Sequence, residues 1–220
     1  PANALSVLHA QREGIKNYSI LTSHVLVPPA MEALVNDETN IVQGFLAAGH
    51  VCTIMGIDEY FPLVEKYKLP VVITGFEPVD LLQGITMLIR QLEAGEYKLE
   101  NQYSRVVKPE GNPHAKKIIE EVFEVSAREW RGIGEIPLSG YEVKEQLKEF
   151  DANKKFAINI EKAGESKECI AGEILRGIKK PNQCPQFGKK CTPINPLGAP
   201  MVSSEGACAA YYHFTNTEAL

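Results

Sequence analysis

The stretch "LPVVITGFEPVDLLQGITMLIRQLEAG", residues 69–95, decides the fold class. Residues 69–76 are almost continuously apolar, which is typical of a β-strand that is covered on both faces. Residues 77–95 then carry apolar side chains at helical spacing and predict a long helix. A buried strand that leads directly into a long helix is half of a βαβ unit, the building block of parallel sheets.

Similar strand and helix patterns lie on both sides of this stretch. Since repeated strand–helix units imply a parallel sheet with right-handed crossovers, we expect an α/β domain with a Rossmann-like parallel sheet. Strands are predicted in residues 17–27 and 41–51, the second including a loop, and a turn-rich strand region in residues 128–143. Helices are predicted in residues 4–14, 28–37, 58–68 and 112–125.

The composition and the hydrophobic periodicity of the sequence change near residue 150. Polar and weakly periodic residues follow, and the rest of the chain is rich in Gly, Pro and Cys. We therefore expect an α/β sandwich domain in residues 1–150 and a smaller, irregular C-terminal region in residues 151–220. No internal repeat divides the chain further.

Size and charge exclude several classes of protein. A chain of 220 residues can bury a sizeable core. The net charge of −5 includes no block of like charges, so no nucleic-acid partner is expected. No apolar run is long enough for a membrane span and no signal-peptide pattern opens the chain, so a cytoplasmic location is the expectation. The first residue is not Met, which suggests a piece of a longer polypeptide.

Four of the five cysteines gather in the last quarter of the chain. Cys169, Cys184, Cys191 and Cys208 are separated by fourteen, six and sixteen residues, whereas Cys52 stands apart as a small apolar residue. Clustered cysteines in a reducing compartment indicate metal binding or catalysis. The compact spacings of zinc ribbons and bacterial ferredoxins are absent. A 4Fe-4S cluster, a zinc ion and a redox-active disulfide therefore all remain open.

Lysines surround two of these cysteines. Positive charge lowers the pKa of a nearby thiol, which suits bound thiolates of any kind. An ordinary solvated surface is the alternative for each lysine taken singly. The four lysines are Lys179, Lys180, Lys189 and Lys190.

Six stretches of the sequence together resemble the HypD family of NiFe-hydrogenase maturation factors. In the C-terminal region these are "GEILRG" (172–177), "CPQFGKKCTP" (184–193) and "GAPMVSSEGACAAYY" (198–212). Earlier in the chain they are "GFEPVDLLQGI" (75–85), "ENQYSRVV" (100–107) and "EWRGIG" (129–134). In that family four C-terminal cysteines hold a 4Fe-4S cluster, and the matching positions are Cys169, Cys184, Cys191 and Cys208.

The resemblance implies a scaffold rather than a turnover enzyme. HypD proteins work with a HypC-type chaperone and a HypE-type cyanide donor to assemble the Fe(CN)2CO unit on a transiently held iron, and the cluster is thought to move electrons. The family's iron-handling cysteines lie in motifs similar to CGTH and GPGCPVC, which do not occur in this sequence. The chain is therefore expected to be the C-terminal three fifths or so of such a protein and to lack the iron-assembly site.

Polar residues at predicted strand ends suggest a second site. Ligands of open α/β sheets bind beyond the carboxyl ends of the strands. His24, His50, Glu77 and Asp80 are the candidates there, and Arg105 could pair with one of the carboxylates. The alternative is that the carboxylates only favour the N-terminus of their helix and that the histidines are ordinary loop residues.

Two other functions compete with a maturation scaffold. One is a stand-alone iron–sulfur redox protein, although the sequence has no GxGxxG loop and no P-loop for a nucleotide. The other is a structural zinc-binding domain that mediates protein contacts. Iron and zinc content would separate these possibilities.

Overall fold

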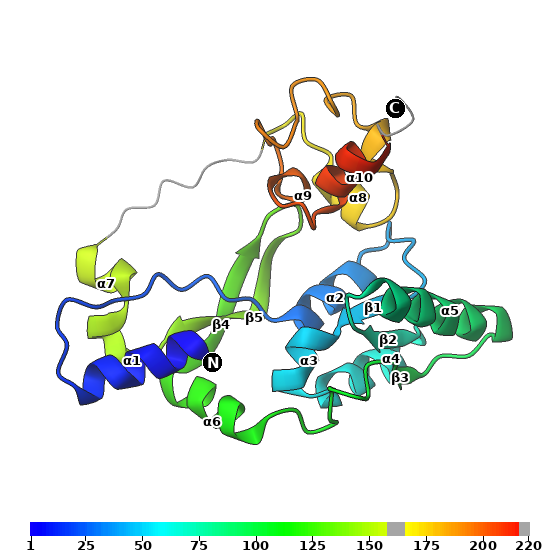
Figure 1. Cartoon of the computed structure of the whole chain (residues 1–220). Coiled ribbons are helices and arrows are strands. Elements are labelled where there is room, and N and C mark those ends of the chain that lie inside the picture. Colours follow the sequence, from blue (N-terminus) through cyan, green and yellow to red (C-terminus); the bar gives the residue numbers. More distant parts are fainter. Residues whose placement is uncertain (158–165, 216–220) are drawn as a thin grey trace. The chain divides into compact units, whose positions relative to one another are not determined.

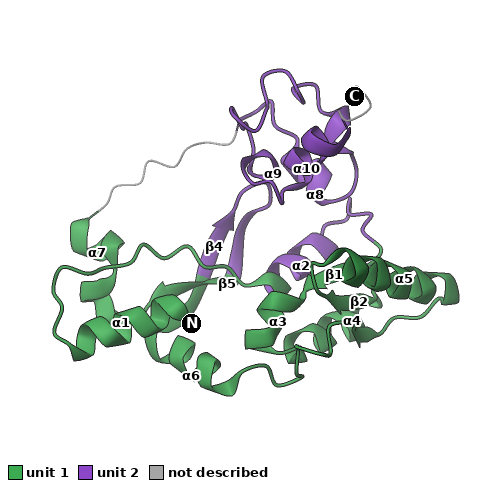
Figure 2. Cartoon of the chain, in the orientation of Figure 1, with its two compact units in different colours: residues 1–28, 43–126, 138–158 green, residues 29–42, 127–137, 159–220 purple. Residues whose placement is uncertain are grey.

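The computed structural model describes residues 1–157 and 166–215 and has a mixed α/β architecture (Figure 1). The chain divides into two compact units (Figure 2). Unit 1 comprises residues 1–28, 43–126 and 138–158, and unit 2 comprises residues 29–42, 127–137 and 159–220. The predicted division at residue 150 stays a prediction.

Unit 1 contains a three-stranded parallel sheet. Its strands are β1 (Phe45–Ala48), β2 (Val71–Thr74) and β3 (Leu99–Asn101), in that order across the sheet. Phe45 pairs with Val71, which in turn pairs with Leu99. All four residues of the central strand are buried, as the apolar run predicts.

Helices connect these strands. Between β1 and β2 lie α3 (Gly49–Met55), the short 3-10 helix η1 (Asp58–Tyr60) and α4 (Phe61–Tyr67). Between β2 and β3 lies α5 (Pro78–Ala94), which confirms the predicted long helix. Proline suits the first turn of α5 because it needs no N–H donor there, and Gly95 ends the helix in the left-handed conformation.

A second core of unit 1 lies among α1 (Ala2–Arg12), α6 (Pro113–Val122) and the elements that follow α6. The Asn112 side chain caps α6 by accepting a hydrogen bond from the Ala115 N–H at 3.0 Å. The later elements are β4 (Phe123–Trp130), β5 (Gly134–Val143), the 3-10 helix η2 (Glu145–Phe150) and α7 (Ala152–Phe156). β4 and β5 form a two-stranded sheet, whose turn belongs to unit 2.

Two predictions about secondary structure are wrong. Residues 17–27 form no strand, since only isolated bridges of Ile20 with Asp151 and of Val25 with Gly140 occur there. The helix predicted to reach residue 125 ends at residue 122, because the backbone becomes extended at Phe123 and continues as β4.

Unit 2 is built from short elements and loops. Its helices include most of α2 (Val27–Val35), and then α8 (Ala171–Leu175), η3 (Pro181–Gln183), α9 (Ala199–Val202) and α10 (Ala207–Thr215). Its small core consists of Cys191, Met201, Cys208 and Ala209. Two of the four predicted ligand cysteines are therefore core residues of this unit.

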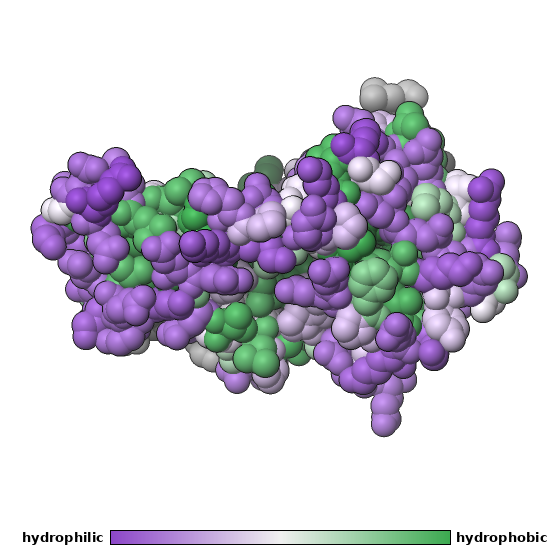
Figure 3. Space-filling view, turned by 90° about the horizontal axis from the view of Figure 1, so that it is seen from below, coloured by the Kyte–Doolittle hydropathy of each residue, from purple (hydrophilic) through white to green (hydrophobic). Residues whose placement is uncertain are grey.

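The face seen in Figure 3 is mostly hydrophilic, with apolar patches between the hydrophilic residues. Within residues 1–157 and 166–215, no helix has the length and apolar character needed to cross a bilayer.

Candidate functional site

The four clustered cysteines line one cavity of unit 2. Each comes from a different segment: Cys169 precedes α8, Cys184 follows η3, Cys191 closes the next loop and Cys208 lies in the first turn of α10. Cys191 and Cys208 are buried, whereas Cys169 and Cys184 are half-buried. The remaining walls are largely apolar and include Ile174, Phe187, Leu197 and Met201.

Backbone hydrogen bonds hold the loop between two of these cysteines. The Cys191 N–H donates to the Gln186 carbonyl at 3.0 Å, and the Gly188 N–H donates back to the Cys191 carbonyl at 3.0 Å. The Leu197 N–H donates to the Cys191 sulfur at 3.4 Å. The sulfur of Cys191 is thus held in place and already accepts one backbone donor.

A glycine allows the chain to pass close to another of the thiols. A methyl group added at Gly198 would overlap the Cys169 sulfur. No residue with a side chain fits there unless the thiol or the loop moves. The close approach keeps Cys169 beside the cavity.

The thiols influence one another electrostatically. Burial raises the pKa of the Cys208 thiol to about 11, and the three other cysteines of the cavity add to this shift. Gathering four thiolates without a cation is therefore unfavourable, and a bound metal centre would offset their repulsion. Within the described ranges, no group of three or more His, Cys, Asp or Glu side chains is already arranged around a single metal ion.

Two of the four lysines near the cysteines form ion pairs. Lys190 pairs with Glu168 at 2.9 Å and Lys179 pairs with Glu173 at 2.7 Å. These two charges are compensated by carboxylates. The Glu168 carboxylate also accepts a hydrogen bond from Gln186 at 3.4 Å, so it links the Cys169 segment to the loop that follows Cys184.

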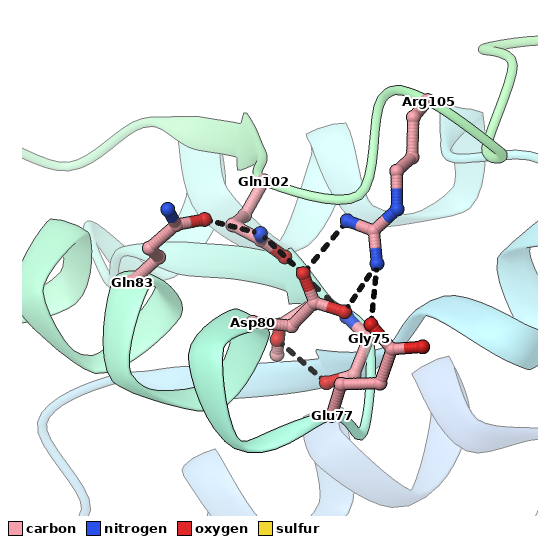
Figure 4. A network of polar contacts seen from close by, with 7 residues as sticks. Gly75, Glu77, Asp80, Gln83, Gln102 and Arg105 are labelled. Carbon is pink, nitrogen blue, oxygen red and sulfur yellow. Dashed lines mark hydrogen bonds and ion pairs between the residues drawn. The ribbon is translucent and has the colours of Figure 1, made fainter.

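A second polar cluster lies at the carboxyl ends of the three parallel strands of unit 1 (Figure 4). Arg105 donates to both carboxylate oxygens of Asp80, at 2.7 and 2.6 Å, and to Glu77 at 3.0 Å. The predicted pairing of Arg105 with a carboxylate is confirmed. Gln102 donates to Asp80 and to Gln83, both at 2.8 Å.

Asp80 is the buried centre of this cluster. Its side chain is only 4% exposed, whereas that of Glu77 is 74% exposed. Hydrogen bonds from Arg105 lower the pKa of Asp80 to about 2, with a further contribution from Gln102. The close approach of Asp80 to the end of β2 depends on Gly75, because a Cβ at that position would overlap the Asp80 carboxylate. Asp80 is therefore ionised at neutral pH and fixed in position.

His50 lies beside the same cluster, at the end of β1. Its ring stacks on Phe76 at 4.9 Å and meets Tyr103 edge-on at 5.9 Å, and Arg105 lies 4.5 Å from the centre of the Tyr103 ring. The structure thus brings His50, Glu77 and Asp80 to one edge of the sheet, while any functional role of theirs stays a prediction.

His24 is not part of this cluster. It lines a different cavity of unit 1, of about 280 Å³, and its ring lies 5.5 Å from that of Phe123. Residues 17–27 are an irregular segment and not a strand of the parallel sheet. His24 is therefore not at the edge of the sheet, where it was predicted to lie.

The cluster has two further members that were not predicted from the sequence, Gln102 and Tyr103. Both directly follow β3, a three-residue strand that is too short to give a periodic signal. Two features of the sequence point to them: their position after a third strand and their place in "ENQYSRVV" (100–107), one of the stretches that resemble the HypD family. His9 and His114 are exposed.

Comparisons with known proteins agree on one family. A family model described as "HypD: Hydrogenase formation hypA family" matches residues 1–215. Hydrogenase expression/formation protein HupD of Azotobacter chroococcum is 46% identical, and Hydrogenase maturation factor HypD of Azotobacter vinelandii is 45% identical; each match covers 97% of this chain and 58% of the relative. The Rhodobacter capsulatus HypD is 42% identical over all of this chain and 59% of its own length. The chain thus spans a little under three fifths of these relatives.

Proposed function

Because this chain belongs to the HypD family of hydrogenase maturation proteins, we propose that it is part of a scaffold for metallocofactor assembly and carries a 4Fe-4S cluster. The ligands proposed are Cys169, Cys184, Cys191 and Cys208. One observation carries the proposal: these four cysteines, from four separate segments, line a single cavity.

The chemistry of the cavity fits an iron–sulfur cluster. Thiolates are the usual ligands of such clusters. The walls of the cavity are largely apolar, which limits the access of solvent to the cluster. The free space in the cavity is about 20 Å³, close to that of one water molecule, so binding a cluster has to widen it. A bound cluster would supply one-electron transfer, while the chain's own residues hold the four thiolates and exclude water.

The whole protein's task is also part of the proposal. We infer that it works with a HypC-type chaperone and a HypE-type cyanide donor, and that an iron carrying cyanide and carbon monoxide ligands is its cargo. The cluster would deliver electrons during this assembly. The protein is then a scaffold with a redox role rather than a turnover enzyme.

An apolar stripe on α5 supports a role in protein binding. Five side chains, between 38% and 66% exposed, follow the spacing of one helical face. Contiguous exposed apolar residues of this kind mark protein–protein contacts. The stripe begins beside Glu77 and Asp80, so a docked partner would lie next to the strand-end cluster. The five residues are Val79, Leu82, Ile85, Ile89 and Leu92.

Metal analysis tests the proposed cluster. Anaerobically purified protein is expected to be brown and to contain about four irons and four sulfides per chain. One zinc per chain and no colour would instead favour the structural zinc domain. A cluster-containing protein that binds neither a HypC-type nor a HypE-type protein would favour the stand-alone redox protein.

A further inference from the structure

The segment that carries three of the four cavity cysteines has a local charge opposite to that of the whole chain. Residues 166–191 contain six Lys and Arg side chains and two Glu side chains, whereas the whole chain has a net charge of −5. Such a basic patch on an acidic protein attracts an acidic partner to one place and repels it elsewhere.

Half of these cations remain uncompensated. Lys190, Lys179 and Arg176 form ion pairs with Glu168, Glu173 and Asp37. In the part of the chain that the structure describes, the other three make no ion pair with a carboxylate. They are Lys167, Lys180 and Lys189, and all three are exposed.

Two of these lysines lie close in sequence to the more accessible side of the cysteine cavity. Lys180 directly precedes η3, the single turn that leads into Cys184, and Lys189 lies in the tight loop that Cys191 closes. Cys184 is half-buried, unlike Cys191 and Cys208. Two positively charged side chains that could attract an acidic partner therefore lie close in sequence to the part of the cavity that is nearest to the solvent.

An isolated apolar side chain lies just after this loop. Ile194 is 97% exposed, the highest value for any large apolar residue described. Its loop is held by the Thr192–Asn195 bridge and by a hydrogen bond of 2.8 Å from the Asn195 side chain to the Lys190 carbonyl. An exposed apolar side chain on a hydrogen-bonded loop, close in sequence to lysines without an ion pair, has the composition of a small, transient interface.

We propose that Lys180, Lys189 and Ile194 form the docking surface for a one-electron carrier with an acidic surface. The inference rests on the proposed cluster. In the encounter, one electron leaves the reduced centre of the carrier and enters the oxidised cluster held by the four cysteines, so the carrier is oxidised as the cluster is reduced. No proton or bond changes hands in this step.

Stopped-flow reduction of the cluster by a reduced plant-type ferredoxin, an acidic one-electron carrier, tests the proposal. The parent is compared with K180E/K189E and with K108E/K117E, a control that changes the charge equally at exposed lysines of unit 1. We expect K180E/K189E to be reduced at least tenfold more slowly at low salt and to lose most of the salt dependence that the parent shows. The control should stay within twofold of the parent. Ile194→Asn should slow reduction but keep the salt dependence.

Several results would overturn the proposal. Equal rates of cluster reduction in the two double variants would contradict the proposed docking surface. A parent whose reduction rate does not depend on salt would contradict it as well. Equally slow reduction of K180E/K189E by reduced methyl viologen, a cation that the new glutamates do not repel, would mean that the cluster itself had changed, which also contradicts the proposal. Absence of iron and sulfide before mixing would overturn the proposed function and this surface together, so the two failures are distinguishable.

Discussion

Arg105 and Asp80 form a two-pronged ion pair, at 2.7 and 2.6 Å, between the segment after β3 and the first turn of α5. The carboxylate is almost fully buried, while the guanidinium is about half exposed and also contacts Glu77. One arginine thus joins a buried carboxylate and an exposed one. The ends of two neighbouring strands of the sheet are connected by this contact.

Asp80→Asn should destabilise unit 1 measurably. The change leaves Arg105 without its buried counter-charge, and we expect the thermal midpoint to fall by roughly 5 °C or more. Glu77→Gln is the matched control, since it removes the exposed partner of the same arginine and should have little effect. Differential scanning calorimetry measures both. Equal midpoints for Asp80→Asn and the parent would show that the pair does not stabilise the fold.

The same pair should make stability depend on pH in the acid range. Hydrogen bonds from Arg105 hold the pKa of Asp80 at about 2, below the ordinary 3.8. A carboxylate with a depressed pKa stabilises the fold fully above its ordinary pKa and loses this contribution as the pH falls toward 2. Urea midpoints at pH 6 and pH 3 should therefore differ less in Asp80→Asn than in the parent.

Glu145 must be separated from this effect. Hydrogen bonds from Lys154, and then from Lys148, also hold its pKa at about 2, but its side chain is 68% exposed. Glu145→Gln should change the acid dependence less than Asp80→Asn does. The reverse order would contradict the assignment to Asp80.

Single cysteine variants should separate ligands from bystanders. Cys184→Ser and Cys191→Ser should lose stable cluster binding, because serine is a poor substitute for a thiolate ligand. Cys52→Ser should keep nearly all of the iron, since Cys52 is buried in unit 1, where burial raises its pKa, and its hydroxyl replacement can still bond to Tyr60. Iron and sulfide content of the three proteins decides this. Parent-like content in Cys184→Ser would contradict the four-ligand assignment.

Gly198→Ala should reduce cluster content through sterics alone. The added methyl group would overlap the Cys169 sulfur and push that ligand or its loop away from the cavity. We expect less than half of the parent's iron per chain after identical anaerobic purification. Gly14→Ala is the control: it strains a left-handed residue with no atom near the new methyl group, so it should lower stability without lowering iron content.

The apolar stripe on α5 should carry affinity for a partner protein. Replacing Leu82 and Ile89 together by Asp should weaken capture of a HypC-type protein at least tenfold, because both side chains are exposed and on one face of the helix. Glu93→Gln, at an exposed position of the same helix, should leave capture unchanged. Circular dichroism would establish that both variants are folded. Undiminished capture by the double variant would exclude the stripe as the contact.

The sequence predicts the parts of the fold that have strong periodicity. The central strand and α5 are long apolar patterns, and both are confirmed. The strand predicted in residues 17–27 is wrong, although its β-branched and aromatic residues favour extended structure. Pairing partners decide whether such a segment forms a strand, and in the described residues it makes only isolated bridges.

The sites were predictable to different degrees. Cysteine spacing alone left zinc and an iron–sulfur cluster open, because convergence of four distant segments on one cavity is a tertiary property. The strand-end cluster could be anticipated from Glu77 and Asp80, since the ends of parallel strands meet at one edge. Gln102 was not predicted, because the three-residue strand before it gives no pattern of its own, although Gln102 lies in the family-like stretch "ENQYSRVV".

Native mass spectrometry of the anaerobically purified chain shows directly whether the four cysteines hold a cluster. We expect one dominant species that carries four irons and four sulfides and that is lost in Cys184→Ser but kept in Cys52→Ser. A species with one zinc, or a metal-free chain with equal spectra in all three proteins, would contradict the claim that these four cysteines hold a cluster.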